Sequence, residues 1–138
     1  MGVRRKARET LLQLLFQAEL NNEKDPKELL KYFWKNFKTD PEISQWAGPR
    51  FLKILELKGE LDQKIEKASE HWKVYRMSHI DRNILRTALF EFFYDEGTPA
   101  EIVMDEAIEV AKRFGSEGSG AFVNGILDKT WKEKSPAQ

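Results

Sequence analysis

Residues 78–93, SHIDRNILRTALFEFF, decide the fold class of this 138-residue chain. Ser78 and Asp81 stand at the spacing with which two residues cap the first turn of a helix. Behind them, six apolar side chains recur at helical spacing: Ile84, Leu85, Ala88, Leu89, Phe92 and Phe93. A face this broad predicts a helix that is buried on two sides and ends near Gly97.

Two further helices are predicted on the C-terminal side of this stretch. The first begins at the capping signature of residues 98–101 and ends at Gly115. The second follows a glycine-rich link, residues 115–120, and runs from Phe122 to Trp131. The tail that follows it is expected to fray.

Three helices are predicted on the N-terminal side. Apolar residues at helical spacing predict the first over about residues 4–20. An aspartate followed by a proline opens the second, over residues 25–37. Residues 39–42 and 48–49 contain helix breakers, so the third and longest helix is expected over residues 51–72.

The pattern as a whole predicts an all-α protein. No stretch alternates between polar and apolar residues well enough to predict a strand. The length favours one compact domain over residues 1–138. A weak seam near residues 74–78 would divide that domain into two small helical bundles.

The composition argues against several functions. The chain has no cysteine, which removes disulfides, thiolate metal sites and cysteine nucleophiles. His71 and His79 lack the spacing of a metal-binding pair, and a small hydrolase using Asp81 or His79 has no recognisable pair of nucleophile and base. We therefore expect no metal, no cofactor and no catalytic residue. No stretch approaches the roughly 20 apolar residues that span a bilayer, so a cytoplasmic location is expected.

The start of the chain is basic, although the 23 basic and 23 acidic residues balance overall. Arg4, Arg5, Lys6 and Arg8 all precede the first acid, Glu9. Each positive charge near a helix N-terminus is unfavourable by about 0.3–1 kcal/mol, so folding alone does not favour this cluster. One interpretation is a solvated, disordered terminus. The other is neutralisation of RNA phosphates, which suits the bidentate fork of arginine.

The glycine-rich link is a second candidate site. Its amides precede a helix, whose positive end could hold a phosphate group. Phe114 and Phe122 flank the link and offer stacking surfaces for bases. The link lacks the Gly-Lys-Ser/Thr ending of a P-loop, so the alternative is a plain helix connector with both aromatic rings in the core.

Charged residues near the start of the helix over residues 78–93 form a third candidate. Asp81, Arg82 and Arg86 predict an ion-pair ladder on the polar side of that helix. The ladder is either ordinary surface pairing or a docking patch for a protein partner.

Four segments resemble the NusB family of transcription antitermination factors, in this order and spacing, over nearly the whole chain. They are RRKARETLLQLLFQAEL (4–20), WKVYRMSHIDRNILRTALFEF (72–92), DEAIEVAKRFG (105–115) and FVNGILDK (122–129), of which the last is the most specific. The resemblance implies a NusB-like antitermination fold and a non-catalytic role in processive antitermination, notably of ribosomal RNA operons. It implies as partners boxA RNA, the small-subunit ribosomal protein NusE and the RNA polymerase antitermination complex. We expect no membrane partner, and we expect the chain to be a monomer or a homodimer.

The resemblance also assigns residues to these partners. The family's arginine-rich RNA-binding start matches Arg4, Arg5, Lys6 and Arg8, and its second RNA-contacting region matches Phe114, Gly118, Ser119 and Phe122. The NusE-binding face matches Phe16, Asp81 and Phe90, and Arg82 adjoins it.

One position departs from the family pattern. Ala121 stands where the family often has a lysine. The missing lysine removes a phosphate contact. This predicts that the chain alone binds RNA more weakly, or that its RNA affinity relies more on NusE. A NusB-like domain also occurs fused to ribosomal RNA cytosine methyltransferases, but 138 residues leave no room for that catalytic domain. The remaining alternative is a helical scaffold that binds proteins or itself and has no specific RNA.

Overall fold

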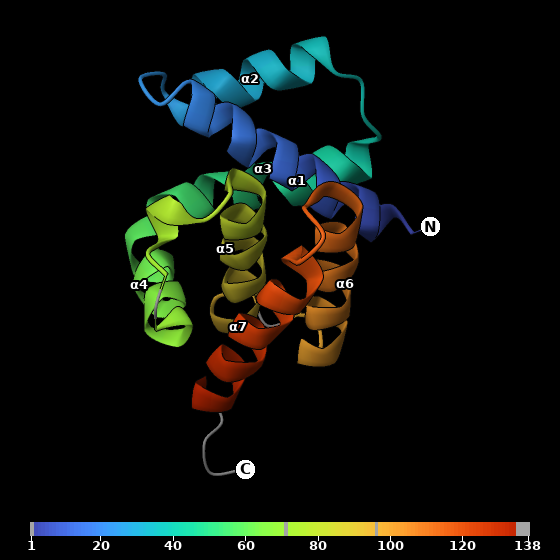
Figure 1. Ribbon diagram of the computed structural model, residues 1–138. Helices are drawn as coiled ribbons and strands as arrows, with labels where there is room; N and C mark the ends of the chain where they lie inside the picture. Colours follow the sequence, from blue (N-terminus) through green and yellow to red (C-terminus); the bar gives the residue numbers. More distant parts are fainter. Residues whose placement is uncertain (1, 71, 96, 135–138) are drawn as a thin grey trace. The chain divides into compact units, whose positions relative to one another are not determined.

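The structure, a computed structural model, describes residues 2–70, 72–95 and 97–134, so His71 and the end of the tail lie outside the described residues. Within these ranges it contains seven α-helices, one short 3-10 helix and no strand, which confirms the all-α prediction (Figure 1). The chain divides into two compact units, Met1–Leu57 (unit 1) and Lys58–Gln138 (unit 2). The segment 74–78, where a seam was expected, lies inside unit 2. No helix in the described ranges is long and apolar enough to cross a membrane.

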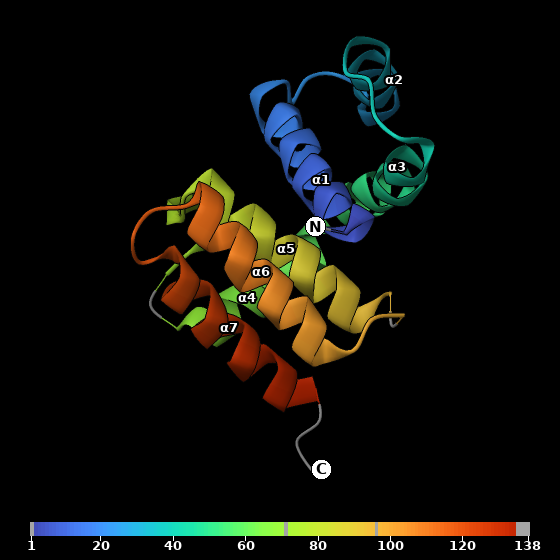
Figure 2. The same ribbon diagram turned by 90° about the vertical axis from the view of Figure 1, so that its right-hand side faces the viewer.

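Unit 1 is a three-helix unit of α1 (Val3–Leu20), α2 (Pro26–Asn36) and α3 (Pro41–Glu56). The three helices contact one another, and α1 packs along α3 (Figure 2). α2 begins as predicted, because the Asp25 side chain accepts a hydrogen bond of 3.1 Å from the backbone N–H of Lys27. Apolar side chains from all three helices fill the core: Leu11, Leu14, Leu15, Leu29, Phe33, Ile43, Ala47, Phe51 and Ile54.

The third helix differs from its prediction. The prolines at 41 and 49 were expected to break the chain, with a helix starting at Phe51, but α3 begins at Pro41 and continues through Pro49 to Glu56. A proline at the first helical position costs nothing, whereas one in the interior costs about 3 kcal/mol. Four buried residues on one face of α3 offset that cost: Ile43, Ala47, Phe51 and Ile54. A new helix then starts at Lys58, so the expected long helix is two helices.

Unit 2 contains the remaining elements: α4 (Lys58–Ser69), the 3-10 helix η1 (Val74–Arg76), α5 (His79–Phe93), α6 (Ala100–Phe114) and α7 (Ser119–Lys134). α5 packs against α4, α6 and α7, and Figure 2 shows it beside α6. The predicted cap is confirmed, because the Ser78 hydroxyl accepts a 3.0 Å hydrogen bond from the backbone N–H of Asp81. The broad buried face of α5 is confirmed as well.

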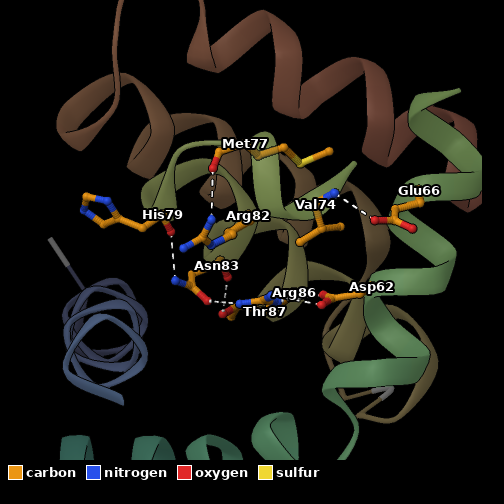
Figure 3. A network of polar contacts seen from close by, with 9 residues as sticks. All are labelled: Asp62, Glu66, Val74, Met77, His79, Arg82, Asn83, Arg86 and Thr87. Carbon is orange, nitrogen blue, oxygen red and sulfur yellow. Dashed lines mark hydrogen bonds and ion pairs between the residues drawn. The ribbon is translucent and has the colours of Figure 1, made fainter. Parts of the chain in front are cut away.

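A buried ion pair joins α4 to α5, which corrects the prediction that Arg86 belongs to a surface ladder (Figure 3). The Arg86 guanidinium donates to both carboxylate oxygens of Asp62, from Nε at 2.7 Å and from Nη2 at 2.9 Å. Its Nη1 donates to Asn83 Oδ1 at 2.9 Å. The side chains of Arg86 and Asp62 are only 6% and 23% exposed. Helical spacing alone did not show that Arg86 falls on the face of α5 that meets α4.

Candidate functional site

The first turn of α1 carries the predicted basic cluster. Arg4 and Lys6 are exposed, Arg5 is half-buried, and Arg8 is only 7% exposed. Gly2 caps the helix without a side-chain hydrogen bond, and the first turn contains no acidic residue. The positive end of the helix dipole therefore adds to the charge of the side chains. Arg4, Arg5 and Lys6 can reach a polyanion directly, whereas Arg8 is placed to act within the fold.

Three guanidinium groups converge on one indole ring in unit 1. The guanidinium carbons of Arg4, Arg8 and Arg50 lie 4.9, 5.4 and 4.3 Å from the centroid of the Trp46 ring. Arg50 also donates from Nη1 to the backbone carbonyl of Trp46 at 3.0 Å. Cation–π attraction holds such groups near an aromatic face and offsets part of their mutual repulsion.

The sequence did not predict the contribution of Trp46 and Arg50. Both lie on α3, one helical turn apart, in a stretch that was expected to be a connection. The spacing of Arg4 and Arg8 on α1 is also one turn, so these two arginines share one face of α1, as Trp46 and Arg50 share one face of α3. A correct prediction of α3 would have placed Trp46 and Arg50 on one face of that helix, but the two prolines argued against a helix there, and the contact with α1 depends on packing.

The predicted second RNA region lies in unit 2, where α6 ends and α7 begins. Phe114 is 39% exposed, and the Arg113 guanidinium lies 5.1 Å from the centroid of its ring. Gly118 is exposed and Phe122 is half-buried. These residues can meet a ligand. Ser119 is only 1% exposed.

Ser119 holds the link in place. Its hydroxyl accepts a 3.0 Å hydrogen bond from the backbone N–H of Ser116, which closes the turn before α7. Gly115 lies directly against it. A Cβ atom on Gly115 would stand 2.6 Å from Ser119 Cβ and 2.7 Å from the backbone oxygen of Ala111. The link therefore has a defined shape that depends on glycine at 115.

Gly115→Ala is expected to lower the free energy of unfolding by about 1–3 kcal/mol, the usual cost of overpacking. The backbone oxygen of Ala111 cannot move away without distorting α6. Gly118→Ala is the matched control in the same link, because nothing lies within 4 Å of the Cβ it would add. Thermal melting of both variants checks this. Equal melting temperatures for the two variants would contradict the packing described for Gly115.

Ala121 is exposed on the first turns of α7, one residue before Phe122. A lysine at this position would meet solvent. We therefore expect Ala121→Lys to fold normally and to bind RNA more tightly, because it restores a positive charge beside the link. Equal RNA affinities of the two proteins would contradict the role predicted for the missing lysine.

The predicted protein-binding residues are distributed over both units. In unit 1, Phe16 is half-buried on α1. In unit 2, Asp81 and Arg82 are half-buried on the first turn of α5, and Arg82 Nη1 donates to the backbone oxygen of Met77 at 3.1 Å (Figure 3). Phe90 is only 5% exposed, which suits a packing role better than a direct contact.

Asp81 has an unsatisfied carboxylate. Among the described residues, its Oδ1 is buried and accepts no hydrogen bond. A buried acceptor without a donor is unfavourable by about 1–3 kcal/mol, and more when it is charged.

The chain is similar to curated proteins over nearly its whole length. The model of the NusB family matches residues 5–132. The transcription antitermination protein NusB of Sorangium cellulosum is 40% identical over 129 residues, which cover 94% of this chain and 91% of that protein. The NusB protein of Syntrophomonas wolfei is 42% identical over 132 residues, covering 96% and 98%.

Solved structures agree with this similarity. NusB of T. maritima matches with a TM-score of 0.85 at 38% identity, covering 94% of this chain and 91% of that chain. A crystal structure of antitermination factors NusB and NusE in complex with dsRNA contains a chain that matches with a TM-score of 0.82 at 27% identity. That match covers 96% of this chain and 98% of the other.

Proposed function

Because the chain belongs to the NusB family, we propose that it is a transcription antitermination factor that binds boxA RNA of nascent, notably ribosomal, transcripts together with NusE. The observation that carries the proposal is the match over 96% of this chain to a chain in the crystal structure of NusB and NusE in complex with dsRNA. The chain would act in the cytoplasm, by binding within the RNA polymerase antitermination complex and without catalysis.

The proposed RNA contacts come from each unit separately. In unit 1, the phosphates would be neutralised by Arg4, Arg5 and Lys6. Arg8 is buried and would act within the fold. In unit 2, the exposed ring of Phe114 would stack on a base, and the link around Gly118 would follow the backbone. Ser119 would act indirectly, because it fixes the shape of the link through Ser116.

The proposed NusE contacts centre on Asp81. Asp81 is half-buried, and its negative charge suits a cationic group from a basic ribosomal protein. Arg82 is already bonded to the backbone of Met77, so it would hold the start of α5 in shape. Phe16 would contribute an apolar contact from unit 1, and Phe90 would act by packing.

Asp81→Lys is expected to weaken NusE binding by about 10- to 100-fold, since it replaces an attraction by a repulsion of like charges. The change leaves the Ser78 cap intact, because that bond uses the backbone N–H of residue 81. Glu101→Lys is the matched control, since it also reverses an acidic charge in the first turn of a helix. Titration calorimetry with purified NusE measures both. Equal losses of NusE affinity in the two variants would show that net charge causes the loss, and would count against a specific contact at Asp81.

Transcription through a terminator tests the proposed function. A template carrying boxA upstream of the terminator is transcribed by RNA polymerase with NusE and the other antitermination factors, with and without this chain. We expect the chain to raise readthrough on this template and to leave readthrough unchanged on a template with scrambled boxA. Equal readthrough on both templates would favour the helical scaffold without specific RNA.

A further inference from the structure

A pocket of about 390 Å³ opens between α1 and α3 of unit 1, next to the converging arginines. Arg4 and Arg50 line it with the Trp46 ring, and Glu42 and Gln45 complete its polar lining. Glu42 and Gln45 are exposed, and both precede Trp46 on α3. The volume falls within the range of about 300–1,000 Å³ that is usual for small-ligand sites.

The charge of this pocket favours an anion. Arg4 and Arg50 contribute two positive charges to the lining, and Glu42 contributes one negative charge. Arg8 does not line the pocket, but its guanidinium carbon lies 5.4 Å from the centroid of the Trp46 ring and adds a third positive charge nearby. The pocket also lies at the N-terminal end of α1, where backbone amides and the dipole add positive potential.

The remaining lining groups suit a nucleobase. The guanidinium groups of Arg4 and Arg50 already lie over the Trp46 ring, and their outer flat faces are surfaces on which an unpaired base can stack. The Gln45 amide both donates and accepts hydrogen bonds, and the Glu42 carboxylate accepts them from an exocyclic amino group. Glu42 repels phosphate, so a phosphate would occupy the arginine side of the pocket.

We propose that this pocket binds one unstacked nucleotide of single-stranded RNA, with the phosphate on Arg4 and Arg50 and the base edge at Gln45 and Glu42. The inference rests on the proposed function and extends it, since it adds Trp46, Arg50 and Gln45 to the RNA-binding residues. Arg8 is a positioning residue, because it is only 7% exposed, does not line the pocket and contacts the Trp46 ring, which does.

Binding of a fluorescein-labelled single-stranded boxA RNA to the full chain tests the proposal. Arg50→Gln is expected to weaken binding about tenfold and to reduce the salt slope of the affinity by about 0.7, the loss of one phosphate contact. Lys53→Gln is the matched control on the same helix, because the Lys53 side chain is 63% exposed and pairs with Glu56. The RNA affinity of this control should stay within about twofold of that of the parent chain.

A second variant separates RNA binding from folding. The arginine–indole cluster could merely join α1 to α3, in which case Arg50→Gln lowers the melting temperature and leaves the RNA affinity of the folded protein unchanged. Arg50→Lys keeps the charge and loses the planar fork, so we expect it to melt near the parent chain and to bind RNA about three- to fivefold more weakly. Arg50→Lys with unchanged RNA affinity would overturn the proposal.

Gln45→Ala with a set of boxA RNAs, each lacking one base, tests the base contact. We expect Gln45→Ala to weaken the binding of intact boxA RNA. One RNA of the set lacks the base that occupies the pocket, and the variant and the parent chain should bind that RNA equally well. A Gln45→Ala effect of equal size on every RNA, or no effect on any, would overturn the base contact.

Two outcomes separate the nucleotide pocket from the proposed function. If the Arg50 and Gln45 variants bind boxA RNA as the parent does, and the parent still prefers boxA to a scrambled RNA, the nucleotide pocket is wrong and the proposed function stands. If the parent shows no preference, both fail.

Discussion

Replacing Asp62 by alanine is expected to lower the free energy of unfolding by about 2–4 kcal/mol, a large share of the stability of a small domain. The change removes both acceptors that Arg86 reaches with its Nε and Nη2 atoms. The guanidinium, with its side chain 6% exposed, would then keep its charge without its main partner. We place the loss below the full cost of breaking a buried pair because Asp62 itself is 23% exposed.

Asp128→Ala is the matched control for this prediction. Asp128 also pairs with a cation, Lys132, but the two side chains are 50% and 74% exposed. Exposed pairs of this kind contribute about 0–1 kcal/mol. Denaturant unfolding of both variants measures the difference. A loss at Asp62 no larger than that at Asp128 would show that the pair between α4 and α5 does not stabilise unit 2.

The triple replacement of Arg4, Arg5 and Lys6 by alanine is expected to weaken boxA RNA binding by roughly 100- to 2,000-fold, if each charge contributes about 1–1.5 kcal/mol. The salt slope should fall by about 2, because roughly 0.7 is lost for each phosphate contact on a single strand. Arg8 is left in place because it is buried in unit 1. Stability should stay equal or rise slightly, since positive charges at the start of α1 oppose the helix dipole.

The matched control removes three basic residues from α2 of the same unit. Lys27, Lys31 and Lys35 are all exposed, and this variant changes the net charge by the same amount. Anisotropy titrations over a salt series compare the two variants. A comparable loss of affinity in the control would mean that net charge, and not the start of α1, attracts the RNA.

Local signals predicted those helices whose ends and faces obey short-range rules. Asp25 and Ser78 cap α2 and α5 as their sequences indicated, and the apolar stripe of α5 is buried on a broad face. α3 does not follow these short-range rules. Its buried face continues through Pro49, so packing against the rest of unit 1 outweighs the local cost of the proline. A short stretch of sequence does not reveal that packing compensates for the cost of the proline, because this packing depends on the neighbouring helices.

The candidate site was predicted where its residues lie close together in the sequence. Arg4, Arg5 and Lys6 are neighbours, so their shared charge was evident. Trp46 and Arg50 were missed because they join the site only through the packing of α3 on α1. Arg86 was misplaced for the same reason: its partner Asp62 is far away in the sequence and on another helix.

Equilibrium binding of boxA RNA, compared with a scrambled RNA of equal length and measured with and without NusE, tests the central claim most directly. We predict that the chain prefers boxA, that NusE strengthens this preference, and that the Arg4, Arg5 and Lys6 triple variant loses it. Equal affinity for boxA and scrambled RNA in the presence of NusE would contradict the account and leave a helical protein that binds other proteins alone.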